Sequence, residues 1–459
     1  MKPYSAYKPS GVPWLGDVPG HWAVERIRFR ATLNPGASRQ LDGDALVSFL
    51  PMEAIGDDGL LNLDRVRTVD EVSSGYTYFE ERDVAIAKIT PCFENGKGAV
   101  MQGLCGGAGF GTTELIVMRP DARLFPKWLY YLTMCQVFRS PGEAMMLGAG
   151  GQKRVPDLFV KDYSAAFPSI DEQQAIAEYL DIESARIDEL IREKKGLIEI
   201  LEEVRAAVFA TVLARLAGAA SFSRGDRFPW LPCMPSTWEA TKVKYLTLSV
   251  DQGISPQCEA YPPGEGEWGV LKVGCVNTGD FDPSESKALP SDIEPIEDIT
   301  LTQGDVVISR ANTKNLVGRA AMADRAYSRL MLSDKHYRLR LDVARCEPAF
   351  LVYLLAHPWV RARIEERATG ASASMLNIDR RTILDLDVPL PPRPTQCLVI
   401  DDVKAERESL AKLIAHTQDE IRLLKELRAA TIADAVLGRI DVRPAIAAGQ
   451  PATSNNPSV

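Results

Sequence analysis

The heptapeptide LEEVRAA at residues 201–207 returns as LKELRAA at residues 424–430, 223 positions later. A second match lies upstream of each heptapeptide, where the pattern of tryptophans and a proline that begins at Trp14 recurs at Trp230, 216 positions later. The chain therefore contains two copies of a unit of some 220 residues. A molecule built from two such copies is suited to bind a partner that itself has two halves.

Around each heptapeptide, apolar residues recur at spacings of three and four, which predicts two long helices, over residues 168–218 and 391–440. Ser169 and Glu172 have the spacing of a capping box, and Gly218 and Gly438 are stop signals. Because a lone helix of this length cannot bury its own stripe, we expect the two to pair as an intramolecular coiled coil. The alternative is that each helix packs on its own domain. The predicted seam consists of Leu180, Ile187, Ile191, Ile198, Leu201, Val204, Leu410, Ile414, Ile421, Leu424 and Leu427.

The regions 1–167 and 219–390 have a different pattern from the helical stretches. Short runs rich in Val and Ile, such as residues 83–90 and 304–310, alternate with turn residues and with helix-like stretches. We expect an α+β domain in each region. Residues 219–227 are a polar connector, and residues 441–459 are expected to form a disordered tail.

The composition is that of an ordinary globular protein, with 46% apolar and 25% charged residues in 459. No apolar run is long enough to span a bilayer, which predicts a protein without membrane segments. The eight cysteines are scattered and the four histidines lack metal-ligand spacing, so we expect no disulfide framework, no metal site and a reducing, cytoplasmic environment. The net charge of −9 leaves nucleic acid possible, since binding needs only a local basic surface.

Motifs for catalysis are missing from the sequence. The glycine-rich segments at 106–111 and 148–154 do not have the P-loop pattern. The segment Asn34-Pro35-Gly36 approaches the tetrapeptide with which amino-methyltransferases hold an amine, but it fails at the third position. The residues alone therefore give little support to a catalytic function.

Basic and amide residues gather beside turns at corresponding places in the two copies. Arg and Lys can contact guanine edges, Asn and Gln adenine edges, and all of them phosphates, whereas the simpler interpretation is a solvated loop. The candidate DNA-binding residues are Lys88, Thr90, Asn95, Lys97, Gln152, Lys153, Arg154, Arg310, Asn312, Lys314, Asn315 and Arg319.

These motifs resemble the specificity subunits of type I restriction–modification systems, the HsdS family. The segments that carry the resemblance are YKPSGVPWLG at 7–16, AKITPCFENGK at 87–97, GQKRVP at 151–156 and FPSIDEQQ at 167–174. The chain departs from the family pattern at Thr395, where Glu is usual, and at residues 369–374, which lack the basic triplet of the first copy.

The resemblance implies two target-recognition domains, at 1–167 and 219–390, inverted relative to each other and held apart by an antiparallel pair of the long helices. Each domain would read one half of a split target in double-stranded DNA. The subunit would be non-catalytic and would hold no cofactor of its own.

The partners implied by the resemblance are two methyltransferase subunits, which use S-adenosylmethionine, and restriction subunits, which use ATP and Mg²⁺. The acidic stretch 171–205, with 11 acidic against 5 basic residues, would be the docking surface for the methyltransferase subunits. Two alternatives remain: a free-standing DNA-binding regulator, and the recognition part of a single-chain restriction–methyltransferase enzyme.

Overall fold

The computed structural model describes residues 2–38, 40–56, 58–148, 151–218, 222–223, 228–231, 234–372 and 375–447. Most of the expected connector at 219–227 lies outside the described residues. The chain divides into two compact units. The first unit combines Met1–Lys195 with Gln418–Val459, and the second is the continuous segment Gly196–Thr417.

The globular region of the first unit is built on two four-stranded sheets. In spatial order, the first sheet contains β6 (Val66–Thr68), β5 (Leu46–Leu50), β10 (Ala108–Gly111) and β7 (Thr77–Glu80). The second contains β4 (Ala31–Leu33), β11 (Leu115–Pro120), β8 (Val84–Ala87) and β9 (Gly98–Val100). Two further strand pairs join β1 (Tyr7–Pro9) to β2 (Asp17–Pro19) and β12 (Ser164–Phe167) to β3 (Ala23–Arg26).

Strand β8 is buried on both faces, which explains its unbroken apolar sequence. Val84 and Ile86 face a core that the sheet shares with helices, whereas Ala85 faces the core between the two sheets. The region is therefore layered as helices, sheet and sheet.

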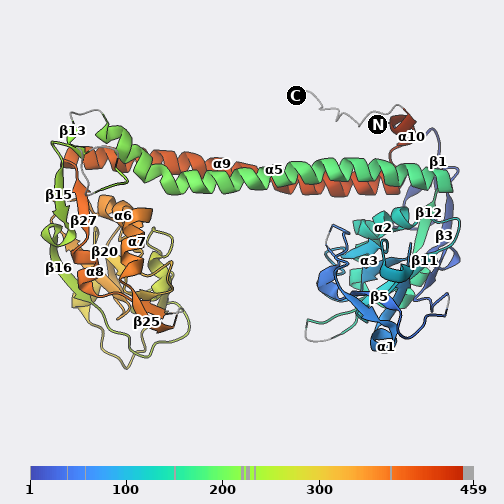
Figure 1. Cartoon of the computed structure of the whole chain (residues 1–459), viewed down its shortest axis with the longest axis horizontal. Helices are drawn as coiled ribbons and strands as arrows, with labels where there is room; N and C mark the ends of the chain where they lie inside the picture. Colours follow the sequence, from blue (N-terminus) through green and yellow to red (C-terminus); the bar gives the residue numbers. More distant parts are fainter. Residues whose placement is uncertain are drawn as a thin grey trace. The chain divides into compact units, whose positions relative to one another are not determined.

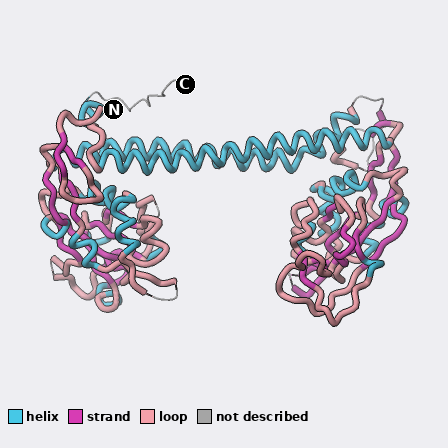
Figure 2. Tube along the Cα trace, turned by 180° about the vertical axis from the view of Figure 1, so that it is seen from behind, coloured by secondary structure: helices cyan, strands magenta, loops and turns pink. Residues whose placement is uncertain are grey.

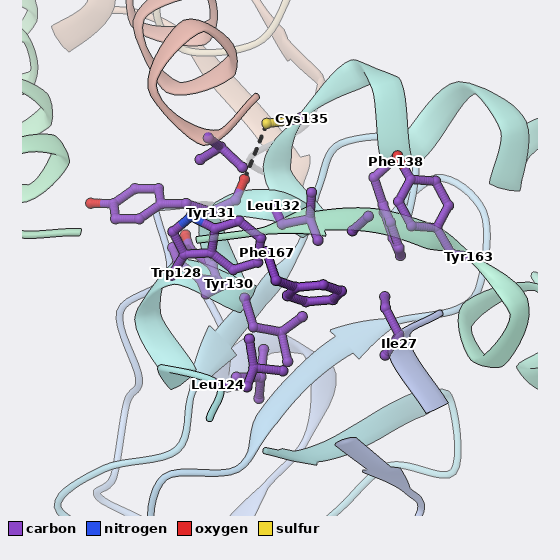
Figure 3. Packing of buried hydrophobic residues seen from close by; sticks show 14 of the residues in the cluster. Ile27, Leu124, Trp128, Tyr130, Tyr131, Leu132, Cys135, Phe138, Tyr163 and Phe167 are labelled. Atoms are coloured by element: carbon purple, nitrogen blue, oxygen red, sulfur yellow. Dashed lines mark hydrogen bonds between the residues drawn. The ribbon is translucent and has the colours of Figure 1, made fainter. Parts of the chain in front are cut away.

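The helical layer consists of α2 (Pro126–Met134), α3 (Gln136–Ala144) and α4 (Asp157–Asp162), with the one-turn α1 (Val69–Val72) elsewhere in the region. Trp128, Phe138 and Tyr163 are buried together with Phe167, the last residue of β12 (Figure 3). The thiol of Cys135 donates to the carbonyl of Tyr131 at 3.3 Å within this cluster (Figure 3). Aromatic and aliphatic side chains together thus fill the space between sheet and helices.

The second unit repeats this architecture strand for strand. One sheet contains β16 (Thr247–Gln252), β24 (His336–Leu341), β20 (Val306–Ser309) and β22 (Ala320–Met322). The other contains β18 (Ser286–Ala288), β17 (Gly269–Leu271), β23 (Tyr327–Met331) and β19 (Thr300–Leu301). Each region has a single parallel pair among its described strands, β10 with β5 and β23 with β17. The internal repeat seen in the sequence is therefore a repeat of topology, and the fold is α+β.

The second unit has further described strands and α-helices besides its two four-stranded sheets. The strands are β21 (Ala311–Asn312), β26 (Met375–Asn377), β25 (Thr369–Ser372), β15 (Glu239–Lys242), β27 (Asp387–Leu390), β13 (Phe222–Ser223) and β14 (Met234–Pro235). The helices are α6 (Pro348–Ala356), α7 (Pro358–Glu366) and α8 (Arg380–Leu384).

Two long helices, α5 (Ile170–Ala217) and α9 (Arg393–Val436), contribute to both units. Within the first unit they run antiparallel, because Asp188 of α5 pairs with Arg428 and Lys194, further along α5, pairs with the earlier residue Glu420. Figures 1 and 2 show the two helices side by side within each unit. The paired helices form an intramolecular coiled coil, as the sequence predicts.

A buried glutamine joins each long helix to its globular region. The side chain of Gln173 accepts from the N–H of Phe125 at 2.7 Å and donates to the carbonyls of Arg123 and Pro168, both at 3.0 Å. Neither polar end of this amide is exposed, because the residue is fully buried. The amide therefore replaces water for one carbonyl just before α5, that of Pro168, and for two backbone groups of the segment that leads into α2.

The same three bonds recur at the start of α9. Gln396 accepts from the N–H of Glu347 at 2.9 Å and donates to the carbonyls of Arg345 and Pro391, both at 2.8 Å. The departure at Thr395 leaves this docking intact.

The predicted capping box at the start of α5 forms only in part. Ser169 Oγ accepts from the N–H of Glu172 at 3.3 Å. The Glu172 carboxylate does not return to the helix start but accepts from Trp22 Nε1 at 3.2 Å and lies 2.8 Å from His21 Nε2. In the second copy, Thr395 replaces this glutamate and Thr237 replaces the histidine, so both partners are lost together.

The buried side of α5 follows a period of 3.5 residues. Ile187 and Ile191 are buried, Lys194 and Ile198 are half-buried, and Leu201 is buried again. Steps that alternate between four and three are those of a coiled-coil heptad. The other predicted seam residues that are buried or half-buried are Leu180, Leu410, Ile414, Ile421 and Leu424.

Two predicted seam residues, Val204 and Leu427, are wrong, since they are 47% and 53% exposed. Each lies three residues after the preceding seam leucine, where the alternation requires a step of four. By that alternation the next position is Arg205 in α5, whose side chain is itself exposed, and Arg428 in α9. Arg428 is half-buried and lies 3.3 Å from Asp188, so its aliphatic stem covers the seam while its charge is paired.

The prediction that residues 441–459 are disordered is wrong for residues 441–447. Val442 is fully buried in the core of the first unit, and α10 (Arg443–Ala447) follows it. The N–H of Asp441 donates to the carbonyl of Lys2 at 2.9 Å, which ties this segment to the start of the chain. Residues 448–459 lie outside the described residues.

We predict that Leu201→Ala lowers the free energy of unfolding by about 2–5 kcal/mol, because it leaves a cavity in the seam. Leu427→Ala is the matched control: the same side chain is removed from an exposed site, and alanine is the better helix former, so the change is expected to lie within about 0.5 kcal/mol. Chemical denaturation followed by circular dichroism measures both. Equal losses for the two variants would contradict the assigned seam.

His336 makes the second unit sensitive to acid. The imidazole is fully buried, with Nδ1 2.8 Å from Ser333 Oγ and Nε2 3.5 Å from Cys275 Sγ, and burial lowers its pKa to about 4. Because the unfolded state takes up the proton first, the contribution of His336 to stability is full above pH 6.5 and is lost as the pH falls toward 4.

We predict that this group alone removes about 3 kcal/mol of stability between pH 6.5 and pH 4. Urea denaturation at several pH values measures the loss, and His336→Gln is expected to flatten part of the profile. An imidazole resonance that titrates near its ordinary pKa in the folded protein would refute the assignment.

Candidate nucleic-acid interface

Two segments of the first region cross just beyond the end of β8. The N–H of Thr90 donates to the carbonyl of Lys153 at 3.0 Å, and the N–H of Val155 donates to the carbonyl of Lys88 at 2.8 Å. Residues distant in sequence are thus held together by the backbone itself. The predicted site residues gathered at this crossing are Lys88, Thr90, Gln152, Lys153 and Arg154.

The remaining predicted residues of the first copy, Asn95 and Lys97, lie on the turn that leads from β8 to β9. The N–H of Lys97 donates to the carbonyl of Cys92 at 2.9 Å, and Arg139 Nη1 donates to the carbonyl of Glu94 at 2.7 Å. Asn95 is exposed at the tip. The turn is therefore fixed from the helix side while its polar tip faces solvent.

Arg154 is held by a carboxylate that the sequence did not single out. Its Nε and Nη2 donate to the two oxygens of Glu114 at 2.9 Å and 2.7 Å, a bidentate pair. Hydrogen bonding from this guanidinium lowers the pKa of Glu114 and raises that of Arg154. The Arg154 side chain remains 43% exposed, so it is oriented without being hidden.

The second region has a crossing at the corresponding place. The N–H of Arg310 donates to the carbonyl of Lys335 at 2.7 Å, and the N–H of Ile378 donates to the carbonyl of Arg310 at 3.0 Å. Arg310 Nη1 also donates to the carbonyl of Asp334 at 3.1 Å. The Asp334 carboxylate pairs with Lys335 at 3.3 Å.

The loop after Arg310 carries the other predicted residues of the second copy. The amide of Asn312 donates to Asn277 Oδ1 at 3.1 Å and to Ser309 Oγ at 3.3 Å, which orients it. Lys314 and Asn315 are exposed. The loop thus exposes the Lys314 amine and the Asn315 amide close to the hydrogen-bonded amide of Asn312.

Two guanidinium groups lie beneath this loop. Arg361 is buried and pairs with Glu365 at 3.4 Å, while its Nη2 donates to the carbonyl of Asn315 at 3.4 Å. Nε of Arg319 and Nη1 of Arg361 are buried and have no hydrogen-bond partner among the described residues. Burial and the neighbouring Arg319 lower the pKa of Arg361. Arg319 and Arg361 together carry two positive charges and Glu365 carries one negative charge, so the region beneath the loop has a net positive charge.

Sequence reasoning missed three residues at the crossings: Glu114, Lys335 and Asn377. Glu114 and Lys335 directly precede the buried strands β11 and β24, and a charged residue immediately before a strand, found at corresponding places in the two copies, was the available signal. Asn377 pairs across the sheet with Ala311, and no pattern in the sequence indicates that contact.

The chemistry of these crossings suits recognition of nucleic acid. Guanidinium, ammonium and amide groups supply donors for phosphate oxygens and for base edges. Among the described residues, no group of His, Cys, Asp and Glu side chains could hold a metal ion. None of the described helices is long and apolar enough to cross a membrane.

No protein-family model matches the chain. The chain is 27% identical over 464 aligned residues to the type I restriction enzyme EcoEI specificity subunit of Escherichia coli, with 84% of this chain and 78% of the relative covered. It is 39% identical over 163 residues to the EcoAI specificity subunit of Escherichia coli, which covers 35% of this chain and 27% of that relative.

Solved structures agree with this fold. A chain from a type I R-M system studied for complex assembly and conformational transition superposes with a TM-score of 0.71 at 18% identity, covering 92% of this chain and 99% of that one. The HsdS subunit from Thermoanaerobacter tengcongensis gives a TM-score of 0.57 at 18% identity, with coverage of 92% and 98%. With its repeated topology and its paired long helices, the chain has the fold of these solved structures, and over most of its length it is similar in sequence to a type I restriction enzyme specificity subunit.

Proposed function

We propose that this chain is the DNA sequence-specificity subunit of a type I restriction–modification complex. It reads a bipartite target in duplex DNA, with one half-site for each globular region, and it is not itself catalytic. The observation that carries the proposal is the repeated crossing: the same backbone arrangement occurs twice, each time with exposed or half-buried donor side chains.

The two crossings supply what sequence reading requires. Arg154 is oriented by a bidentate carboxylate, so its guanidinium is fixed before DNA arrives. The amide of Asn312 donates to Asn277 and Ser309 and accepts from the N–H of Thr313, so this side chain shapes the loop that carries Lys314 and Asn315. A fixed donor discriminates between bases because a wrong base leaves it unpaired. Lys153 and Lys314 are exposed amines suited to phosphates, which add affinity without sequence information.

The long helices supply the second part of the function. We propose that α5 and α9 act as a ruler, so that their length sets the gap between the two half-sites. Helix α5 has 48 residues and α9 has 44. At about 1.5 Å per residue, α5 is roughly 70 Å long, which is the scale of a spacer rather than of a domain core.

The partners are proposed from the chemistry of the helices and from the family. The stretch 171–205 of α5 carries 11 acidic and 5 basic residues, and such a surface repels DNA. We assign it to protein partners: two methyltransferase subunits that carry S-adenosylmethionine, and through them restriction subunits that use ATP.

The first test is expression of this chain with the methyltransferase subunit of its system, followed by genome-wide mapping of methylated adenines. We expect one split motif, made of two short sequences and a fixed gap. The control is the methyltransferase subunit alone, which is expected to leave that motif unmethylated. Tight, selective binding of one duplex by the purified chain without its partner would favour the free-standing regulator instead.

The ruler is tested by adding seven residues to both long helices, in register, between residues 195 and 196 and between residues 417 and 418. One heptad preserves the seam and lengthens each helix by about 10 Å. Because base pairs are about 3.4 Å apart, we expect the gap in the methylated motif to grow by about three base pairs while both half-sequences stay unchanged.

The control for the ruler is a heptad added to α5 alone, which is expected to disrupt pairing and abolish methylation. A full insertion that methylates sites with the original gap would show that the helices do not measure it.

A further inference from the structure

The two globular regions share a framework whose equivalent positions can be read from their hydrogen bonds. The N–H of Lys88 donates to the carbonyl of Glu114, just as the N–H of Arg310 donates to the carbonyl of Lys335. These two bonds are 2.8 Å and 2.7 Å long. Lys88 is thus equivalent to Arg310, and Glu114 to Lys335.

A second set of contacts extends the equivalence. Ile89 and Arg154 form an antiparallel bridge, as Ala311 and Asn377 do. The chain then continues to Val155 and Ile378, whose N–H groups donate to the carbonyls of Lys88 and Arg310. Arg154 and Asn377 therefore occupy the same place in the two regions.

The side chains at these equivalent places differ in charge and in hydrogen-bonding type. The first region has Glu114 and Arg154, an ion pair with no net charge. The second has Lys335 and Asn377, with a net charge of +1 before the neighbouring Asp334 is counted. The backbone hydrogen bonds are thus the same in the two regions, whereas the side chains at these two positions differ in charge and in hydrogen-bonding groups.

We infer that these four residues are specificity-determining, one pair for each half-site. Arg154 would contact a base acceptor in the first half-site, and Glu114 would position it. Asn377, beside Lys335, would contact the second half-site. The inference rests on the proposed function and deepens it, because it names the residues that make the two half-sites different.

The geometry indicates what each pair prefers. The Arg154 guanidinium uses Nε and Nη2 on Glu114, which fixes its plane, and Nη1 donates one hydrogen to the carbonyl of Gln152 at 3.5 Å. The second hydrogens of Nη1 and Nη2 remain for a ligand. Such a group suits a guanine edge, which offers two acceptors. The Asn377 amide has a donor and an acceptor, as an adenine edge requires.

The test uses the complex of this chain with its methyltransferase subunit and duplex libraries in which one half-site at a time is randomised. For Glu114→Gln we expect discrimination in the first half-site to fall about 5- to 150-fold, the range of one bidentate base contact. The second half-site serves as the internal control and is expected to stay unchanged. Asn377→Ala should produce the converse result.

Asp121→Asn is the matched control variant. Asp121 also pairs with an arginine, since its Oδ2 accepts from Nε and Nη2 of Arg123 at 3.0 Å and 2.7 Å, but it follows β11 whereas Glu114 precedes it. The same chemical change at the far end of the strand should leave both half-sites unaltered.

Three results would overturn the inference. They are unchanged half-site selection by both Glu114→Gln and Asn377→Ala, equal loss with Asp121→Asn, and uniform weakening for all sequences with a smaller salt dependence, which marks a phosphate contact. Asn377→Ala keeps the inference testable if Glu114→Gln fails to fold. A wild-type complex without any sequence preference would instead refute the proposed function.

Discussion

The arrangement of this molecule depends on an uncharged side chain buried at the first turn of each long helix. Gln173 and Gln396 each satisfy one backbone N–H and two backbone carbonyls that water cannot reach. An unpaired buried group of this kind costs about 1–3 kcal/mol, so the helix start has one favourable position against its globular region. Because three hydrogen bonds at Gln173 match three at Gln396, the two globular regions are attached to their long helices in the same way. The proposed functions of the helices depend on this attachment.

The attachment of the helices is the same in both units, but the side chains at the two backbone crossings beyond β8 and β20 differ. The backbone bonds that join Lys88 to Glu114 and Arg310 to Lys335 are nearly equal in length, whereas the side chains they carry have opposite charges at one position. Backbone hydrogen bonds are indifferent to the side chain, so a framework made of them tolerates change in what it presents. That separation allows one scaffold to recognise two different half-sites.

Much of this organisation could be predicted from the sequence, because repeats and helical periodicity are local patterns. The long helices, the α+β regions and their pairing follow from spacing alone. Val204 and Leu427 were misplaced because each stands one residue before the position that the heptad alternation requires, Arg205 or Arg428, of which only Arg428 is half-buried. The Glu114–Arg154 pair spans 40 residues of sequence, and only the folded sheet brings it together. Tail residues such as Val442 were misjudged because their burial depends on the other end of the chain.

The division of the chain between the units has a consequence for biosynthesis. The second unit is one continuous segment, Gly196–Thr417, so all of its contacts are available before synthesis ends. The first unit takes Ile432, Val436 and Val442 into its core. The region made first on the ribosome is therefore completed last, after some 220 intervening residues have been made. Until residues 432–442 have been made, the core of the first unit lacks part of its cover. Apolar side chains are then exposed, and a chaperone that binds apolar surface would act at this stage.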